Sequence, residues 1–171
     1  SYKLWIYPKA EAQISEEEIV LEKERVFISH SLNQAKKRLR DGEKTILFTD
    51  RSDASIDNTY CTNFWNYPMF RSISESMGKP VPVGTMGMWT DKNHPALKGF
   101  AADDYTTPPW FHIVMHSHAD ILTGKNADII AQPIDNTERC HRLGLLYEID
   151  TDEGKLLVCT SKIWEISDKP E

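Results

Sequence analysis

The sequence lacks any apolar run close to the roughly 20 residues that a helix needs to cross a bilayer. It has only three cysteines, and none of the pairs among Cys61, Cys140 and Cys159 has the C-x2-C spacing of a zinc or redox site. Basic residues are outnumbered, with 20 Lys and Arg against 26 Asp and Glu and a net charge of −6. The single compact basic cluster, at residues 36–40, is typical of the solvated face of a helix. We therefore expect no membrane span, no disulfide framework and no nucleic-acid partner.

Familiar catalytic motifs are missing as well. The sequence contains neither G-x-S-x-G nor G-x-C-x-G, the strained nucleophile turns of hydrolases and amidotransferases, and it has no P-loop and no G-x-G-x-x-G. Carboxylates occur close together in Asp103-Asp104 and in Asp50, Asp53 and Asp57, but loop aspartates usually cap turns. We predict no catalytic residues in this chain and no cofactor.

Three histidines form the pattern H-x3-H-x-H. His112 and His116 would share one face of a helix, a spacing that can ligate zinc. The acidic residue of H-E-x-x-H is absent, and His118 would lie on a different face. We interpret the pattern as an exposed polar face and predict no metal site.

We expect no signal peptide in the given sequence. Ser1–Trp5 lacks the charged and apolar regions of a signal peptide, and the chain begins without Met. Such a start fits a processed protein, and it fits a domain of a longer protein at least as well.

The clearest structural pattern is a strand, a helix and a strand in the first third of the chain. Val26–Ser29 is a compact apolar strand, and Ser31 with Gln34 forms an S-x-x-Q capping box that begins a helix. Gly42 ends the helix, and Lys44–Thr49 has the β-branched and aromatic residues of a second strand. This spacing predicts a βαβ unit with parallel strands. The polar loop at residues 50–60 would then lie at the carboxyl edge of the sheet, where ligand sites gather.

Residues 84–116 alternate between strand and helix signals. A short strand at Met86–Trp89 is followed by a helix that begins at Pro95 and ends at Gly99. Thr107 begins a longer helix with two prolines in its first turn. The alternation indicates a sheet with helices packed against it.

The last third of the chain is strand-rich. Ile129–Gln132 is a strand that Pro133 restricts to an edge or brings to an end. Gly144–Asp150 and Lys155–Cys159 flank the loop at residues 151–154, which predicts a β-hairpin. We expect one α/β domain over residues 1–171, with an N-terminal strand and polar linker in residues 1–25 and a core in residues 26–166.

The aromatic-rich stretch at residues 61–70 has two interpretations. Its side chains, which include Trp65 and Tyr67, either form a small core of their own or provide a platform for a sugar ring or a partner. Phe64 and Met69 have no polar group, which favours core packing.

Several segments together resemble a known family. They are Leu4-Trp5-Ile6-Tyr7-Pro8, Phe64–Phe70, Gly84-Thr85-Met86-Gly87, Lys92–Leu97, Pro133–Asn136, Leu145–Glu148 and Gly154–Cys159. Their order is similar to that in the C-terminal accessory domain of large bacterial glycoside hydrolases of the family 2, or β-galactosidase-like, type. The similarity extends from residue 3 to about residue 161.

This resemblance implies a mixed, mostly parallel sheet flanked by helices, like that of class I glutamine amidotransferases or flavodoxin. It also implies that the catalytic carboxylates lie on a separate barrel of the same parent chain, an O-glycosyl hydrolase located in the periplasm or outside the cell. The chain would then be a non-catalytic domain that packs on the catalytic part or supports homo-oligomers. Candidate contact residues, with carbohydrate or with the other domain, are Trp65, Tyr67, Trp89 and Trp110.

Two alternatives stay open. The first is a carbohydrate-binding module that contacts polysaccharide through the same exposed aromatic residues. The second is an amidotransferase-like enzyme that uses Cys61 as its nucleophile.

Overall fold

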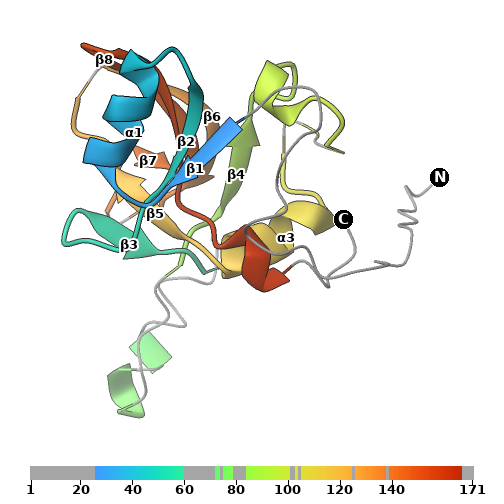
Figure 1. The fold of residues 1–171 in the computed structure, drawn as a ribbon. Helices are drawn as coiled ribbons and strands as arrows, with labels where there is room; N and C mark the ends of the chain where they lie inside the picture. The colour runs from blue at the N-terminus through green and yellow to red at the C-terminus, as the bar shows by residue number, and fades with distance from the viewer. Residues whose placement is uncertain are drawn as a thin grey trace.

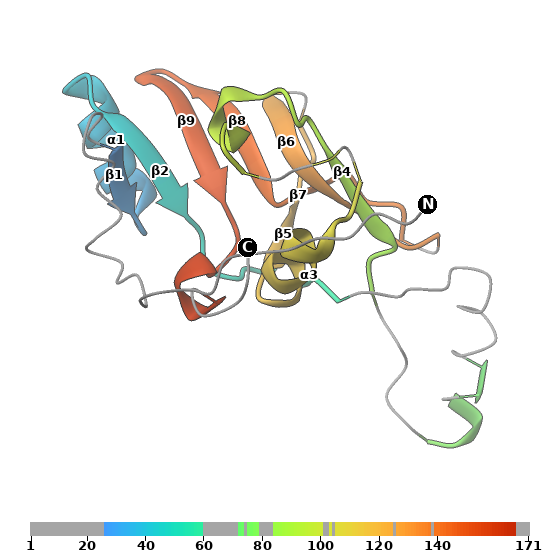
Figure 2. The ribbon, with the colours of Figure 1, turned by 90° about the vertical axis from the view of Figure 1, so that its right-hand side faces the viewer.

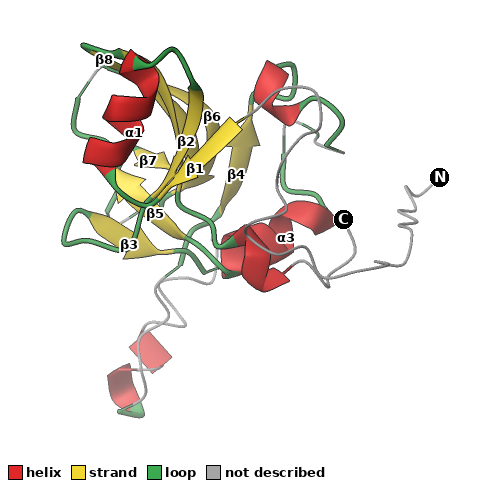
Figure 3. Cartoon of the chain, viewed as in Figure 1, coloured by secondary structure: helices red, strands yellow, loops and turns green. Residues whose placement is uncertain are grey.

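The computed structural model describes residues 26–59, 72–73, 75–78, 84–100, 103, 105–124, 126–137 and 139–166. Its strands are β1 (Val26–Ser29), β2 (Lys44–Phe48), β3 (Ser55–Asp57), β4 (Gly87–Thr90), β5 (His118–Ile121), β6 (Ala127–Ile134), β7 (Leu143–Gly144), β8 (Leu146–Thr151) and β9 (Gly154–Cys159). Its helices are α1 (Leu32–Arg40), α3 (Pro108–Met115) and the 3-10 turns η3 (Pro95–Leu97) and η4 (Ile163–Ile166). The predicted combination of helices with a mixed sheet is confirmed, and strands predominate (Figure 3). The expected N-terminal strand and linker, and the aromatic stretch at residues 61–70, lie outside the described residues.

Six strands form the main sheet, in the order β1-β2-β9-β8-β6-β4 (Figures 1 and 2). The pairs β1–β2 and β2–β9 are parallel, and the other three pairs are antiparallel. The parallel part therefore occupies the β1 side of the sheet, and the antiparallel part extends to β4 at the opposite edge. A second sheet of three short strands has the order β3-β5-β7.

The predicted βαβ unit is confirmed. Strands β1 and β2 pair in parallel, with Val26 opposite Lys44, and α1 connects them. Gly42 adopts φ +79 just after the helix, a backbone conformation that glycine tolerates best.

The predicted capping box does not form. Ser31 occupies the N-cap position, but its side chain makes no capping bond. The hydroxyl of Ser29 instead accepts from the Ser31 amide at 3.2 Å and donates to the Ser31 carbonyl oxygen at 2.9 Å, and the side-chain oxygen of Gln34 lies 3.4 Å away. Ser29, the last residue of β1, therefore makes the polar contacts at the start of α1, because only two residues separate the strand from the helix.

Each face of the main sheet has its own hydrophobic core. Leu156 and Val158 of β9 point to the face covered by α1, where they pack with Ala35. Leu157 lies between them in sequence and points to the opposite face, as expected for a strand. There the core is formed with α3, through Trp110 and residues of β4 and β6.

Two of the basic residues of α1, which were expected on a solvated helix face, form ion pairs with another part of the chain. Lys36 and Arg40 both form ion pairs with Glu153 in the turn of the β8–β9 hairpin, at 3.8 and 2.7 Å. The guanidinium of Arg38 lies 4.4 Å from the centre of the Phe27 ring. Half of the basic cluster therefore attaches the helix to the hairpin.

The predicted edge position of Pro133 is wrong, whereas the predicted strand end is close, because β6 ends at Ile134. Pro133 lies inside β6, which pairs with β4 on one side and with β8 on the other. The ladder with β8 ends at Ala131, two residues before Pro133, so the missing N–H of the proline interrupts no bond to that strand. Pro133 therefore lies in an interior strand, at a point where one neighbour has already ended.

The remaining local predictions are confirmed. Strands β8 and β9 form the predicted hairpin, with Thr151 opposite Gly154, so the connection is shorter than expected. The short helix at Pro95 and the longer one after Thr107 are both present. None of the described helices has the length and apolar composition needed to span a bilayer.

Candidate functional site

A polar cleft lies at the carboxyl end of β2, at the edge that the sequence indicated. The chain leaves β2 through Thr49 and folds back as β3, which pairs antiparallel with β5 so that Asp57 lies opposite His118. The cleft has a volume of about 540 Å³. Its lining comprises Asp50, Arg51, Asp57, Met115, His116, Ser117, His118, Lys162 and Glu165. A volume of this size is typical of small-molecule sites.

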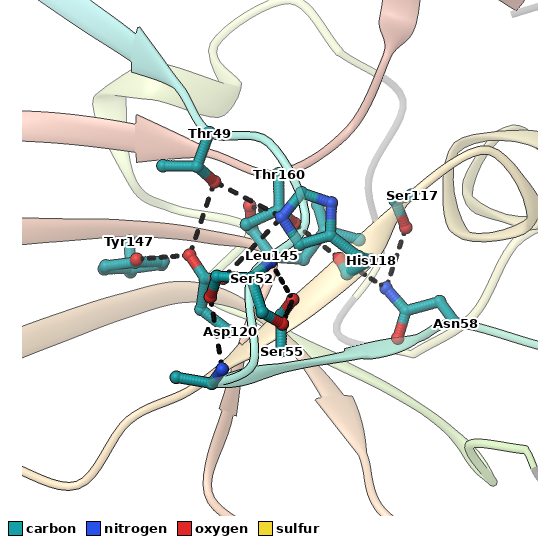
Figure 4. A network of polar contacts seen from close by, with 11 residues as sticks. Thr49, Ser52, Ser55, Asn58, Ser117, His118, Asp120, Leu145, Tyr147 and Thr160 are labelled. Carbon is teal, nitrogen blue, oxygen red and sulfur yellow. Dashed lines mark hydrogen bonds and ion pairs between the residues drawn. The ribbon is translucent and has the colours of Figure 1, made fainter. Parts of the chain in front are cut away.

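A buried polar network supports the floor of the cleft (Figure 4). The His118 Nε2 atom lies 3.4 Å from the Thr49 hydroxyl and 3.6 Å from Asp120 Oδ1. Asp120 Oδ2 accepts hydrogen bonds from the hydroxyls of Tyr147 at 2.8 Å and Thr49 at 3.4 Å. The network joins the main sheet to the small one, because Tyr147 belongs to β8 and Asp120 to β5.

Burial and charge change the titration of two of these groups. Burial lowers the pKa of His118 below its usual 6.5, although nearby Asp120, Asp50 and Asp57 oppose this shift. Burial raises the pKa of the Tyr147 phenol well above its usual range, and the charge of Asp120 adds to this shift. At neutral pH the network therefore contains a neutral imidazole and a protonated phenol.

The backbone of His118 is held firmly. Its carbonyl oxygen accepts a hydrogen bond from the Asn58 amide nitrogen at 2.8 Å and another from the Thr160 hydroxyl at 2.6 Å. Asn58 also donates to the Ser117 hydroxyl at 2.7 Å. These contacts fix the ring at the junction of β3, β5 and the segment after β9.

The network does not have the arrangement of a nucleophile–histidine–carboxylate triad. In such a triad the hydroxyl and the carboxylate contact opposite nitrogens of the imidazole. Here Thr49 and Asp120 both approach Nε2 of His118. The ring therefore cannot take a proton from Thr49 while Asp120 orients its other nitrogen.

The three histidines do not converge on one point. His116 Nδ1 lies 2.9 Å from the backbone carbonyl of His112, so the i, i+4 relation joins a ring to the backbone. Among the residues that the structure describes, no group of three or more His, Cys, Asp or Glu side chains is arranged to hold a metal ion.

The structure describes two of the four predicted aromatic contact residues, and one of these two is exposed. Trp65 and Tyr67, like Cys61, lie outside the described residues. The prediction for Trp110 is wrong: its exposed fraction is 2%, because α3 turns it onto the core against Phe100, at 5.0 Å between ring centres.

Trp89 is exposed, at 45%, and lies on the edge strand β4. On the neighbouring β6, Gln132 lies directly opposite Trp89, and Ile134 follows two residues later with 47% exposure. Residues two apart on a strand share a face, so these three side chains lie together on the sheet face opposite α3. We call Trp89, Gln132 and Ile134 the Trp89 face.

Sequence reasoning missed the His118 network, although one signal was present. His118 and Asp120 are two residues apart, and in a strand this spacing places both side chains on one face. The contact of His118 with Thr49 spans 69 residues and depends on the strand order, which no local pattern reveals.

The buried imidazole predicts a pH dependence of stability. The unfolded state binds a proton on His118 more readily than the folded state does, so this contribution to stability is complete above pH 6.5. It is lost as the pH falls below that value toward and through the folded-state pKa. We expect the free energy of urea unfolding to fall between pH 7.5 and 5, and His118→Gln to remove up to about 1.4 kcal/mol per pH unit from that slope.

His30→Gln, at an exposed position, is the control for the loss of an imidazole elsewhere. An equal slope in wild type and His118→Gln would show that His118 does not titrate as its burial requires.

A family model described as a domain of unknown function (DUF8487) matches residues 27–171. The chain belongs to this family. The DUF8487 match begins within β1 and so takes in nearly every described element, the cleft and the Trp89 face included. No curated protein matches the chain.

Proposed function

We propose that this DUF8487 chain is a non-catalytic accessory domain of a larger carbohydrate-degrading protein of the family 2 glycoside hydrolase type. It packs on the catalytic part of that protein through the Trp89 face. The proposal includes a periplasmic or extracellular location and a role in supporting homo-oligomers. Its starting point is the resemblance carried by the ordered motifs, from Gly84-Thr85-Met86-Gly87 to the β8–β9 hairpin.

The exposure of Trp89 and Ile134 is the observation that carries the docking part. Isolated apolar side chains are common on protein surfaces, whereas neighbouring large ones mark interaction sites. Trp89 and Ile134 are both nearly half exposed, and they lie diagonally across one strand pair. Their exposed area would be removed from water by a partner that rests on the face of the sheet.

The outer edge of β4 is already occupied, so the partner approaches the face and not the edge. The amide of Met88 donates to the Thr106 hydroxyl at 3.0 Å, and the Thr90 hydroxyl donates to the Asp103 carbonyl. The first contact takes a backbone amide that an added strand would need, and the second holds the following loop beside the same strand.

The geometry of the His118 network supports the non-catalytic part. Its hydroxyl and carboxylate share one imidazole nitrogen, and Tyr147 donates to the carboxylate. This arrangement holds the fold together and does not prepare a nucleophile.

The finer fold is part of the same proposal. We infer a relation to the class I glutamine amidotransferase arrangement from the β1–α1–β2 unit and its parallel continuation into β9. The three antiparallel pairs on the β4 side differ from the all-parallel sheet of flavodoxin.

Photo-crosslinking tests the docking surface. A photoreactive phenylalanine analogue at position 89 of the full-length parent protein should crosslink to the catalytic part, because the side chain lies at the contact. The same analogue at position 111 is the matched control, since Phe111 is 46% exposed on α3. Crosslinks from position 111 but none from position 89 would contradict the assignment of the face.

A carbohydrate-binding module is the second candidate, and one observation favours it. Gln132 lies directly across from Trp89, so an aromatic ring and an amide with hydrogen-bond donors and acceptors share a flat surface. If the chain is such a module, titration with galactosides and plant polysaccharides should show millimolar or tighter binding. Trp89→Ala should abolish this binding, and the control Phe111→Ala should leave it unchanged. Absence of binding would reject this candidate and leave the docking role.

A further inference from the structure

The charged side chains of the cleft are mostly paired with one another. Arg51 lies 3.1 Å from Asp57, and Lys162 lies 3.5 Å from Glu165. Asp50 also lines the cleft, and its carboxylate makes no hydrogen bond or ion pair with the residues that the structure describes. Three carboxylates face two cations, which leaves one negative charge, and it is that of Asp50.

His116 presents a nitrogen lone pair. Its Nδ1 lies 2.9 Å from the carbonyl oxygen of His112. A carbonyl can only accept, so Nδ1 carries the proton of the neutral ring. The other nitrogen, Nε2, is therefore an acceptor, and it has no partner among the described residues. His116 itself lines the cleft.

His118 presents a second lone pair by the same logic. The proton of the Thr49 hydroxyl goes to Asp120, so Thr49 can only accept at His118 Nε2, and the carboxylate of Asp120 can only accept as well. Nε2 therefore carries the proton, and Nδ1 is the bare nitrogen. In Figure 4 this nitrogen lies on the side of the ring away from Thr49 and Asp120, and it makes no contact there. The residue as a whole is only 6% exposed.

We propose that the cleft binds a small primary amine in its ammonium form. A primary ammonium carries a positive charge and N–H donors. The residues that line the cleft include one unpaired carboxylate, Asp50, and two imidazole nitrogens, His116 Nε2 and His118 Nδ1, that lack donors among the described residues. Met115, which is 41% exposed, lines the same cleft and offers an apolar surface to a short carbon stem.

Other ligand classes fit this set less well. An anion would meet the unpaired charge of Asp50 and two lone pairs, with Arg51 and Lys162 already engaged by carboxylates. A cation without N–H groups would gain the attraction of Asp50 but would leave both imidazoles unsatisfied.

Titration with n-butylammonium at pH 7.5, followed by NMR of the histidine ring signals, tests the proposal. We expect saturable shifts of the His116 and His118 rings with a dissociation constant in the millimolar range. Tetramethylammonium, which carries the same charge without N–H donors, should give no comparable saturation. Glucosamine compared with glucose shows whether an amine on a sugar is accepted as well as a free alkylamine.

Asp50→Asn keeps the shape of the side chain and removes its charge. We expect it to weaken n-butylammonium binding about fivefold. Asp53→Asn makes the same change in the same exposed loop outside the cleft lining and should leave binding unchanged. Equal shifts with tetramethylammonium, equal effects of the two substitutions, or no saturation of the two rings would each overturn the proposal.

Discussion

Asp135→Ala should lower the free energy of unfolding by about 3 kcal/mol, because it removes the acceptor at the centre of a buried cluster. The carboxylate is 1% exposed. Its Oδ1 accepts from Arg139 at 2.7 Å and from the Asn136 amide at 2.8 Å, and its Oδ2 accepts from the His141 amide at 3.0 Å. Two backbone amides would lose their partner, while Arg139, which is 25% exposed, could recover water. Urea unfolding at pH 7 measures the loss.

Asp128→Ala is the control for this substitution. Asp128 also pairs with a cation, Lys155 at 3.0 Å, but its side chain is 75% exposed. Exposed pairs contribute little, so a change below about 0.5 kcal/mol is expected. If the two substitutions cost the same, the Asp135 cluster does not stabilise the β6–β7 connection.

Trp110→Ala should cost about 3–5 kcal/mol, because it empties the centre of the core beneath α3. Trp110 contacts Phe100 edge to face and shares its cluster with Met88 and Val114. The indole nitrogen has no hydrogen-bond partner within the described residues, so Trp110→Phe removes an unsatisfied donor along with some volume. We therefore expect Trp110→Phe to cost much less than Trp110→Ala.

Trp89→Ala provides the comparison for Trp110. Both substitutions delete a tryptophan, but Trp89 is 45% exposed at an edge strand, and surface changes usually stay within about 0.5 kcal/mol. Thermal and urea unfolding of the two variants should differ clearly. Similar losses would contradict the difference in burial between the two residues.

The local elements could be predicted where the sequence contains clear boundaries. Gly42 ends α1, Pro95 begins η3, and the Gly-ended turn after Thr151 joins β8 to β9. Each of these signals acts within a few residues, through φ values or a missing N–H, so no knowledge of distant segments is needed. The parallel pairing of β1 with β2 also follows, because a helix of this length returns the chain in the same direction.

Predictions failed where the outcome depends on neighbours distant in sequence. Whether Pro133 has a neighbouring strand on both sides depends on where β8 begins, and the sequence does not indicate that point. The burial of Trp110 depends on which face of α3 meets the sheet, and that helix carries apolar residues on several sides. Ser29 and not Ser31 makes the polar contacts at the start of α1, because its hydroxyl bonds to the backbone of Ser31.

The site was only partly visible in the sequence for the same reason. The loop after β2 was expected to form a ligand edge, and the structure has the cleft there. The other wall comes from residues 115–118 and from Lys162 and Glu165, which long-range pairing brings to the end of β2. Trp89 was a candidate from the sequence, whereas its neighbour Ile134 follows from the β4–β6 register alone.

Hydroxyl-radical footprinting can show whether the Trp89 face is covered in the parent protein, because it reports the exposure of individual side chains by mass spectrometry. In the isolated chain both Trp89 and Met115 should oxidise readily, since they are 45% and 41% exposed. In the full-length parent protein the account predicts that Trp89 becomes protected while Met115 stays reactive. Equal oxidation of Trp89 in the two proteins would contradict the proposal that the Trp89 face docks on the catalytic part.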